Sequence, residues 1–312
     1  MGHFLRIVFE PGFFQNEPVR LALVTGGVVA VVSAIVGSFA VIRGQSYAGH
    51  ALADISVTGG AASFLIGIPS LWGFVGVGVV AAAVMDMIGI RRPRGRDLAT
   101  GIVRGAGLGL AALFLYWDTT HSNTTGAAIT ILFGSLFTIS SSILPVVALL
   151  SVAGLGIVAV LYRPLLLSSV STELAVVRGI PVRLVGLLCL VAIAVAVSLS
   201  AMTIGAILST ALLIGPPATA LRLTSKPGLA MIWAALIGLA ATWLGVLLAW
   251  DSFYWPPVRH GWPVSFFVVT LVLIFYLLAR WPAARAMRRA GARSRAARAP
   301  VVAQATPGPQ RG

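Results

Sequence analysis

Long apolar runs, each about the length of a membrane helix, alternate along the chain with short polar or basic segments. A helix needs roughly 20 apolar residues to cross the hydrocarbon core of a bilayer. The pattern therefore predicts eight to ten membrane spans. The clearest are residues 19–42, 48–67, 71–90, 98–117, 143–162, 184–200, 203–221, 229–250 and 264–280.

One further apolar stretch, residues 126–141, is too short and too polar for a clear span. It fits either a half-helix or a helix on the surface of the bundle.

The composition supports the same fold class. Hydrophobic residues make up 58% of the 312 positions and charged residues only 10%, which predicts an all-α, polytopic membrane protein. We divide it into an N-terminal segment (1–18), a transmembrane domain (19–282) and a basic tail (283–312). The single cysteine, Cys189, excludes a disulfide framework or a cysteine-based metal cluster.

Basic residues set the predicted orientation. The net charge of +14 comes from short loops and the tail, which is typical of cytoplasmic loops and does not point to nucleic acid. Residues 91–96, the loop before residue 184, the Arg222–Lys226 loop and the tail are all expected in the cytoplasm. The C-terminus is then cytoplasmic, nine spans place the N-terminus outside, and the chain after Arg298 is expected to be disordered.

The second span carries two ionisable residues, His50 and Asp54. Spacing of four residues places both on one helix face, one turn apart. Ionisable groups inside a membrane are costly and usually face a polar pathway, so the pair is a candidate contact for a divalent cation. The alternative is a His–Asp pair that is satisfied by its own hydrogen bond between packed helices.

Two other charged residues lie inside spans and receive structural interpretations. Asp86 precedes Arg91 and Arg92, so we interpret it as an interfacial, ion-paired residue. Arg104 lies within a turn or two of a loop and is expected to extend towards the membrane surface.

The longest predicted cytoplasmic loop contains a short amphipathic run. Glu173 falls in its first turn, Arg178 near its end, and Gly179 is the expected stop signal. A capped helix of two turns between spans suits the docking of a soluble partner. The alternative is an interfacial helix that lies on the lipid headgroups.

The sequence Gly215-Pro216-Pro217 is expected to end or break an apolar helix. Such a break is tolerated in a membrane where the freed backbone groups are buried or line a cavity. These residues are candidates for a pathway or gate element, and a plain kink is the alternative.

Four stretches carry motifs that occur together in one known family. Residues 132–140 (LFGSLFTIS) resemble the motif L-F-G-x-L-L-T-I-S, and residues 171–181 (STELAVVRGIP) resemble D-P-E-L-A-x-x-x-G-I-P. Residues 205–220 (GAILSTALLIGPPATA) are similar to G-A-L-L-x-x-A-L-L-I-x-P-A-A-T-A. The second span matches R-G-x-S-L-x-G-D-A-L-S-H-A at Arg43, Gly44, Ser46, Gly49, Ala51 and Leu52.

Together these motifs resemble the permease subunits of bacterial zinc and manganese ABC importers, over about residues 12–280. The resemblance implies a multi-pass protein of the bacterial inner membrane that works with a second permease copy or paralogue. It also implies a separate cytoplasmic ATP-binding subunit and an extracytoplasmic metal-binding lipoprotein. The one lysine, Lys226, lies outside any phosphate-binding loop motif, so the chain is expected to be a transporter subunit and not an enzyme.

The sequence departs from the family pattern in two of the four motifs. The pore pair of the family is Asp then His, whereas this chain has His50 then Asp54. The coupling loop has Ser171 and Thr172 in place of Asp and Pro. Both donor types remain on the same helix face, so the resemblance still implies a cation contact at residues 50 and 54, with zinc, manganese or iron as cargo.

Other functions remain as alternatives. A permease for cobalamin or iron–siderophore chelates needs a wider, less charged pathway than a His–Asp pair provides. An ion-gradient-driven carrier would lack the ATPase partner. An intramembrane metalloenzyme needs at least three protein ligands and a base, and the predicted spans contain one histidine.

One protomer offers only two ligands at residues 50 and 54, too few to replace the water shell of a divalent ion. We therefore expect two copies to face each other there, with the pair near the dimer axis and roughly mid-membrane. Small residues around the pair, including Gly49 and Ala53, allow close helix approach.

Overall fold

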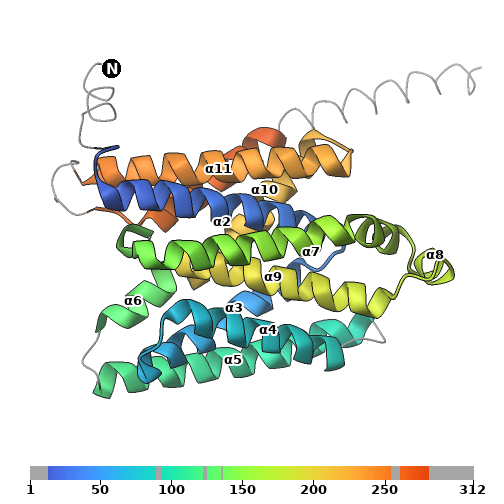
Figure 1. The fold of residues 1–312 in the computed structure, drawn as a ribbon, viewed down its shortest axis with the longest axis horizontal. Helices are drawn as coiled ribbons and strands as arrows, with labels where there is room; N and C mark the ends of the chain where they lie inside the picture. The colour runs from blue at the N-terminus through green and yellow to red at the C-terminus, as the bar shows by residue number, and fades with distance from the viewer. Residues whose placement is uncertain (1–12, 89–92, 122–124, 135, 254–260, 281–312) are drawn as a thin grey trace, which may run out of the picture.

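The computed structural model describes residues 13–88, 93–121, 125–134, 136–253 and 261–280 (Figure 1). Within these ranges the chain is helical and contains no strand. The long helices are α2 (Glu17–Ile42), α3 (Ser46–Ile66), α4 (Ser70–Ile88), α5 (Pro93–His121), α7 (Leu144–Val170), α9 (Val182–Ile204), α10 (Ala206–Leu223), α11 (Pro227–Ser252) and a final helix, Val264–Arg280. Each covers one predicted span, so the all-α fold class is confirmed.

Seven helical segments in the described part of the chain are long and apolar enough to cross a membrane. Two of the nine predicted spans fall short of that standard. The final helix is short, and α3 carries His50, Asp54 and several Ser, Thr and Gly residues that lower its hydropathy. Most of α3 is nevertheless buried by its neighbours, which is how a polar helix is accommodated in a bundle.

The helices form a bundle with α9 at its centre. Helices α2, α10 and α11 lie on one side in Figure 1, and α3, α4 and α5 lie on the other. Helix α9 packs against members of both groups and against α7. Every residue from 192 to 204 is buried, which explains why α9 is apolar all round.

Glycines allow the close approach of α3 to α4. A Cβ atom on Gly59 would overlap the backbone of Gly73, and a Cβ atom on Gly73 would overlap that of Gly59. Small residues at such crossings bring helix backbones into van der Waals contact, which is a main source of helix association in membranes. This contact fixes α3, the helix of the candidate site, against the bundle.

The sequence predicted a helix break at Gly215-Pro216-Pro217, and this prediction is wrong. The break lies instead at Gly205, the first residue of the motif at 205–220. Gly205 separates α9 from α10 with φ 98° and ψ 153°, a conformation suited to glycine. Helix α10 instead continues through both prolines to Leu223.

Tertiary packing explains why the prolines do not end α10. Pro217 has no N–H for the Leu213 carbonyl, and that carbonyl lies against Gly37 of α2, where a Cβ atom would overlap it. Pro216 is buried beside Gly238 of α11. Neighbouring helices therefore hold the segment in helical form.

Residues 126–141 form a short helix, as one of the two interpretations predicted. Helix α6 (Thr125–Phe133) is followed by the 3₁₀ turns η1 (Leu136–Thr138) and η2 (Ser141–Ile143). Helix α6 packs on α3, α5, α9 and α10, and Leu136 is buried against α2. The segment is a half-helix within the bundle.

The two ends of the bundle differ in charge. The turn that contains α8 (Thr172–Val177) lies at one end in Figure 1, together with the end of α10 and the start of α11. Arg178, Arg183, Arg222 and Lys226 belong to these segments. The last turns of α5 and α11, with Asp118 and Asp251, lie at the opposite end.

Predictions for the basic segment 91–96, the C-terminal tail and the N-terminal segment fall wholly or partly outside the described residues. The basic segment 91–96 is described only from Pro93, where α5 begins five residues earlier than expected. The tail after residue 280, including its predicted disorder, lies outside the described residues, as do the first 12 residues.

Candidate cation site

His50 and Asp54 lie on one face of α3, as their spacing predicts. His50 Nε2 and Asp54 Oδ2 are 3.8 Å apart. Both residues are in the first half of the helix, since Asp54 lies eight residues after Ser46, or about 12 Å along an axis of about 30 Å. The pair is thus near the middle of the helix but displaced towards the α8 end.

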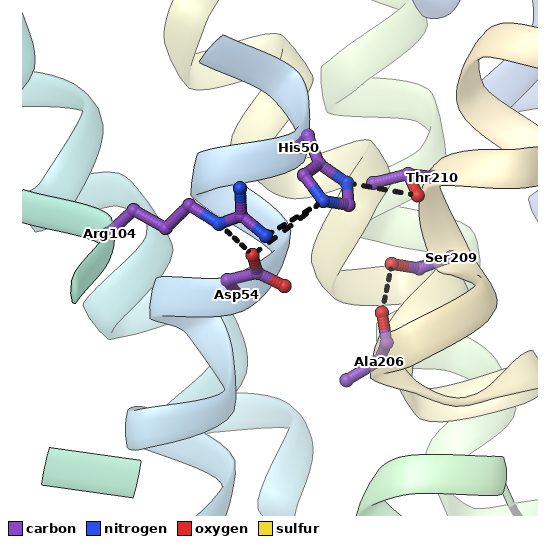
Figure 2. Close-up of polar contacts among 6 residues, drawn as sticks. All are labelled: His50, Asp54, Arg104, Ala206, Ser209 and Thr210. Carbon is purple, nitrogen blue, oxygen red and sulfur yellow. Dashed lines mark hydrogen bonds and ion pairs between the residues drawn. The ribbon is translucent and has the colours of Figure 1, made fainter. Parts of the chain in front are cut away.

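Arg104 of α5 completes this cluster, and the expectation that it extends to the membrane surface is wrong. Its Nε donates to Asp54 Oδ2 at 2.5 Å, and its Nη2 lies 3.1 Å from His50 Nε2. Figure 2 shows the guanidinium in contact with both side chains. The alternative interpretation, in which His50 and Asp54 satisfy only each other by a hydrogen bond, is also wrong, because Arg104 forms hydrogen bonds with both residues.

Close packing of α5 on α3 explains why Arg104 reaches the pair. A Cβ atom on Gly107 would lie 2.9 Å from the side chain of Ile55, so the two helices are close one turn beyond Arg104. A carboxylate and an arginine on different spans form a favourable pair in an apolar layer. The sequence signal was therefore present in Asp54 and Arg104, but it did not show which spans are neighbours.

The hydrogen bonds of His50 determine its tautomer. Arginine has only donors, so the contact of Arg104 Nη2 with His50 Nε2 requires Nε2 to be the acceptor. The ring proton then resides on Nδ1, which lies 3.3 Å from Thr210 Oγ1 of α10 and donates to it (Figure 2). In this arrangement the Nε2 lone pair is directed at the guanidinium and Nδ1 at Thr210.

The cluster lies on a partly open face of the protomer. The side chains of His50, Asp54 and Arg104 are 37%, 14% and 32% exposed. Polar groups at this depth of a membrane protein face protein or a water-filled space rather than lipid. This partly exposed, polar face of α3 and α5 suits contact with another chain or an aqueous pathway better than contact with lipid.

The described residues contain no group of three or more His, Cys, Asp or Glu side chains placed to hold a metal ion. His50 and Asp54 therefore supply one nitrogen and one carboxylate per protomer. Such a pair binds a divalent ion weakly unless further ligands join it.

Asp86, a buried carboxylate near the end of α4, pairs with Arg183 at 3.5 Å. Its interpretation as an ion-paired residue is confirmed, although the observed partner is on α9 and not among Arg91 and Arg92, which lie outside the described residues. The carboxylate at residue 86 is thus engaged at a helix end.

Helix α8 has the caps that its sequence predicted. Ser171 Oγ accepts from the N–H of Leu174 at 3.2 Å. At the other end Gly179 has φ 73°, its N–H donates to Val176, and the N–H of Ile180 donates to Ala175, which is a Schellman motif. Serine at position 171 thus caps this helix where the family pattern has aspartate.

The outer face of α8 is exposed and partly apolar. Leu174, Val176 and Val177 are exposed, and Glu173 and Arg178 lie beside them. Ala175 is fully buried and anchors the helix to the bundle. A projecting helix with an apolar face and charged borders suits a protein partner.

The third predicted group, Gly215, Pro216 and Pro217, is not brought to the cation site. Gly215 packs on Val272 of the final helix and Pro216 on α11. Thr210, on the same helix, is the residue of α10 that contacts His50. A gating role for residues 215–217 stays a prediction.

A family model described as the ABC 3 transport family matches residues 15–281. Similar proteins include the manganese import system permease protein ScaB of Streptococcus pneumoniae, which is 32% identical over 68% of this chain and 74% of ScaB. The manganese transport system membrane protein MntC of Listeria innocua is 28% identical over 70% of this chain and 77% of MntC. The high-affinity zinc uptake system membrane protein ZnuB of Haemophilus influenzae is 27% identical over 68% of this chain and 80% of ZnuB.

Solved structures show the same fold. A chain of the PsaBC complex of Streptococcus pneumoniae with a Fab matches with a TM-score of 0.73 and 24% identity, over 89% of this chain and 94% of that one. A metal-chelate type ABC transporter in an inward-facing conformation matches with a TM-score of 0.67 and 16% identity. The family model and the curated relatives confirm the family resemblance drawn from the four motifs, and the solved structures confirm the fold.

Proposed function

Because this chain belongs to the ABC 3 transport family, we propose that it is the membrane permease of an ATP-driven importer of divalent metal ions. Manganese and zinc are the cargoes named for its relatives MntC, ScaB and ZnuB. Iron is a third ion of the same class. ATP hydrolysis takes place on a separate partner chain.

The observation that carries the proposal is the His50–Asp54 pair on an open face of α3. An imidazole nitrogen and a carboxylate oxygen suit manganese and zinc alike, so the pair selects the class of ion and not one member. His50 Nε2 lies towards Arg104 and Asp54, so its position within the cluster suits a metal ligand. A site with few ligands also releases its ion readily, as transport requires.

Two copies of the chain, or this chain and a paralogue, would complete the site. Facing α3 helices bring together two His50 and two Asp54 side chains, and the two carboxylates balance the charge of one divalent ion. Exposure of His50 and Arg104 on the protomer surface supports such a face.

The partners follow from the two ends of the bundle. The end with α8 carries Arg178, Arg183, Arg222 and Lys226, and an excess of positive charge is typical of the cytoplasmic side. We place the ATP-binding subunit there, against the exposed face of α8. A metal-binding lipoprotein would deliver the ion at the opposite end.

The test is metal uptake in a strain without other importers that expresses the permease with its ATPase and binding protein. His50→Ala and Asp54→Asn should each lower the initial uptake of Mn²⁺ or Zn²⁺ by roughly tenfold or more at normal membrane levels. Asp86→Asn is the matched control, because it also removes a buried carboxylate paired with an arginine. Near-normal uptake by the His50/Asp54 double variant would refute the proposed cargo site, and uptake of labelled cobalamin by the same cells would favour the chelate alternative.

A further inference from the structure

We infer that Arg104 is a tethered competitor of the transported cation: its guanidinium occupies the ligands of the metal-free site and must withdraw as the ion enters. The inference rests on the proposed function of His50 and Asp54. It assigns a specific role to a third residue, which lies on another helix.

The first argument is that the guanidinium and a metal ion require the same atoms. Arg104 Nη2 uses the Nε2 lone pair of His50, and Arg104 Nε uses Oδ2 of Asp54. Thr210 occupies the other ring nitrogen, so Nε2 is the nitrogen left for a metal. A cation cannot bind both ligands while these two hydrogen bonds persist.

The second argument is geometric. His50 Nε2 and Asp54 Oδ2 are 3.8 Å apart. Two ligands of a tetrahedral ion with bonds of roughly 2.0–2.1 Å lie roughly 3.4 Å apart. Small side-chain rotations therefore suffice to form the metal site once the guanidinium has left.

The third argument concerns charge. In each metal-free protomer the guanidinium of Arg104 balances the carboxylate of Asp54. In a pair of protomers, two guanidiniums leave as one divalent ion enters. The two Asp54 carboxylates therefore keep a balancing positive charge before and after the exchange, which is needed for carboxylates in an apolar layer.

The surroundings of Arg104 leave room for this movement. Its side chain is 32% exposed, and nothing lies within 4 Å of a Cβ atom placed on the adjacent Gly105. The Tyr47 hydroxyl, near Gly101 of α5, already interacts with Arg104, so the guanidinium can keep this partner when it releases His50 and Asp54.

The direct test measures Mn²⁺ binding to the purified permease–ATPase complex. Binding is monitored by electron paramagnetic resonance as the loss of the signal of free Mn²⁺. Arg104→Gln removes the competing charge and leaves Asp54 without its counter-ion. We expect it to bind Mn²⁺ roughly ten- to hundredfold more tightly than the unaltered complex. In uptake assays KM and the maximal rate should both fall, because the ion enters easily and leaves slowly.

Two further variants control this measurement. Arg222→Gln removes an arginine whose Nη2 donates to Tyr276, away from the site, and should leave Mn²⁺ affinity unchanged. Arg104→Gln combined with Asp54→Asn keeps the shape of the cluster without its charges and should abolish the gain in affinity.

An Arg104→Gln complex that folds and binds Mn²⁺ with equal or lower affinity would overturn the inference. Removal of an arginine with only a structural role is not expected to raise Mn²⁺ affinity. If this variant is not recovered, Arg104→Met decides, since methionine has similar length but neither a charge nor an N–H donor for the two ligands: tighter binding supports the inference, and equal or weaker binding overturns it. The proposed function is judged separately. It stands if His50→Ala and Asp54→Asn lose uptake, whatever Arg104→Gln does, and it fails if they retain uptake.

Discussion

The Nδ1 atom of His50 lies 3.3 Å from Thr210 Oγ1, and this hydrogen bond joins α3 to α10 across the bundle. Because Arg104 occupies Nε2 as a donor, Thr210 is the acceptor that fixes the tautomer of His50. A residue far away in the chain therefore determines which nitrogen of His50 is offered to a cation.

Replacement of this acceptor tests its importance. Thr210→Val has nearly the same shape but no hydroxyl, so the imidazole loses its orientation. We expect the ratio of the maximal uptake rate to KM for Mn²⁺ or Zn²⁺ to fall roughly tenfold, which is typical of the loss of a group that orients a metal ligand.

Two controls accompany this substitution. Thr210→Ser keeps the acceptor and should retain uptake. Ser209→Ala removes the neighbouring hydroxyl, which donates to Ala206 within α10, and should have little effect. Equal uptake by Thr210→Val and the unaltered protein would show that Thr210 does not position His50.

Exchange of the two ligands tests whether donor type or order matters. The double change His50→Asp and Asp54→His restores the order of the family motif on the same helix face. Arg104 contacts both positions, so each order leaves it a carboxylate partner. We expect the exchanged protein to retain most of its metal uptake, and an activity as low as that of His50→Ala would show that order is essential.

Cross-linking tests whether two copies meet at α3. Cys189 is buried and is first replaced by alanine, which removes the single native thiol. A cysteine at position 50 or 54 should then cross-link two permease chains through a short reagent or a bridging metal, measured by gel mobility. Labelling of these cysteines by a lipid-phase probe without any cross-link would place the face towards lipid.

Gly179 provides a test of the coupling helix. Its φ of 73° is unfavourable for other residues, and a valine there should destabilise the α8 turn by about 1–2 kcal/mol. Since α8 is the proposed docking site, Gly179→Val should reduce co-purification of the ATPase or uncouple ATP hydrolysis from uptake.

The matched substitutions separate backbone strain from general damage. Gly179→Asn tolerates the left-handed conformation and should be milder. Gly156→Ala lies within α7 with open space around its Cβ position and should be neutral. Normal partner binding and transport in Gly179→Val would leave α8 as an interfacial helix.

The sequence by itself determined the features that depend on local physics. The length and hydropathy of each run located the nine long helices of the described residues, seven of which are long and apolar enough to cross a membrane, because every backbone polar group in a membrane must be satisfied within its own helix. The i, i+4 spacing placed His50 and Asp54 on one face, and Gly179 marked the end of α8, because helix capping involves only neighbouring residues.

Only the tertiary structure decided how residues distant in the chain combine. Arg104 has the same local sequence whether it extends to the membrane surface or bonds Asp54, and the choice depends on the packing of α5 against α3. Pro216 and Pro217 favour a break by local preference, yet α10 continues through them because α2 and α11 hold it in place. Both outcomes depend on which helices are neighbours, and apolar periodicity carries no information about that, since nearly every face of a membrane helix is apolar.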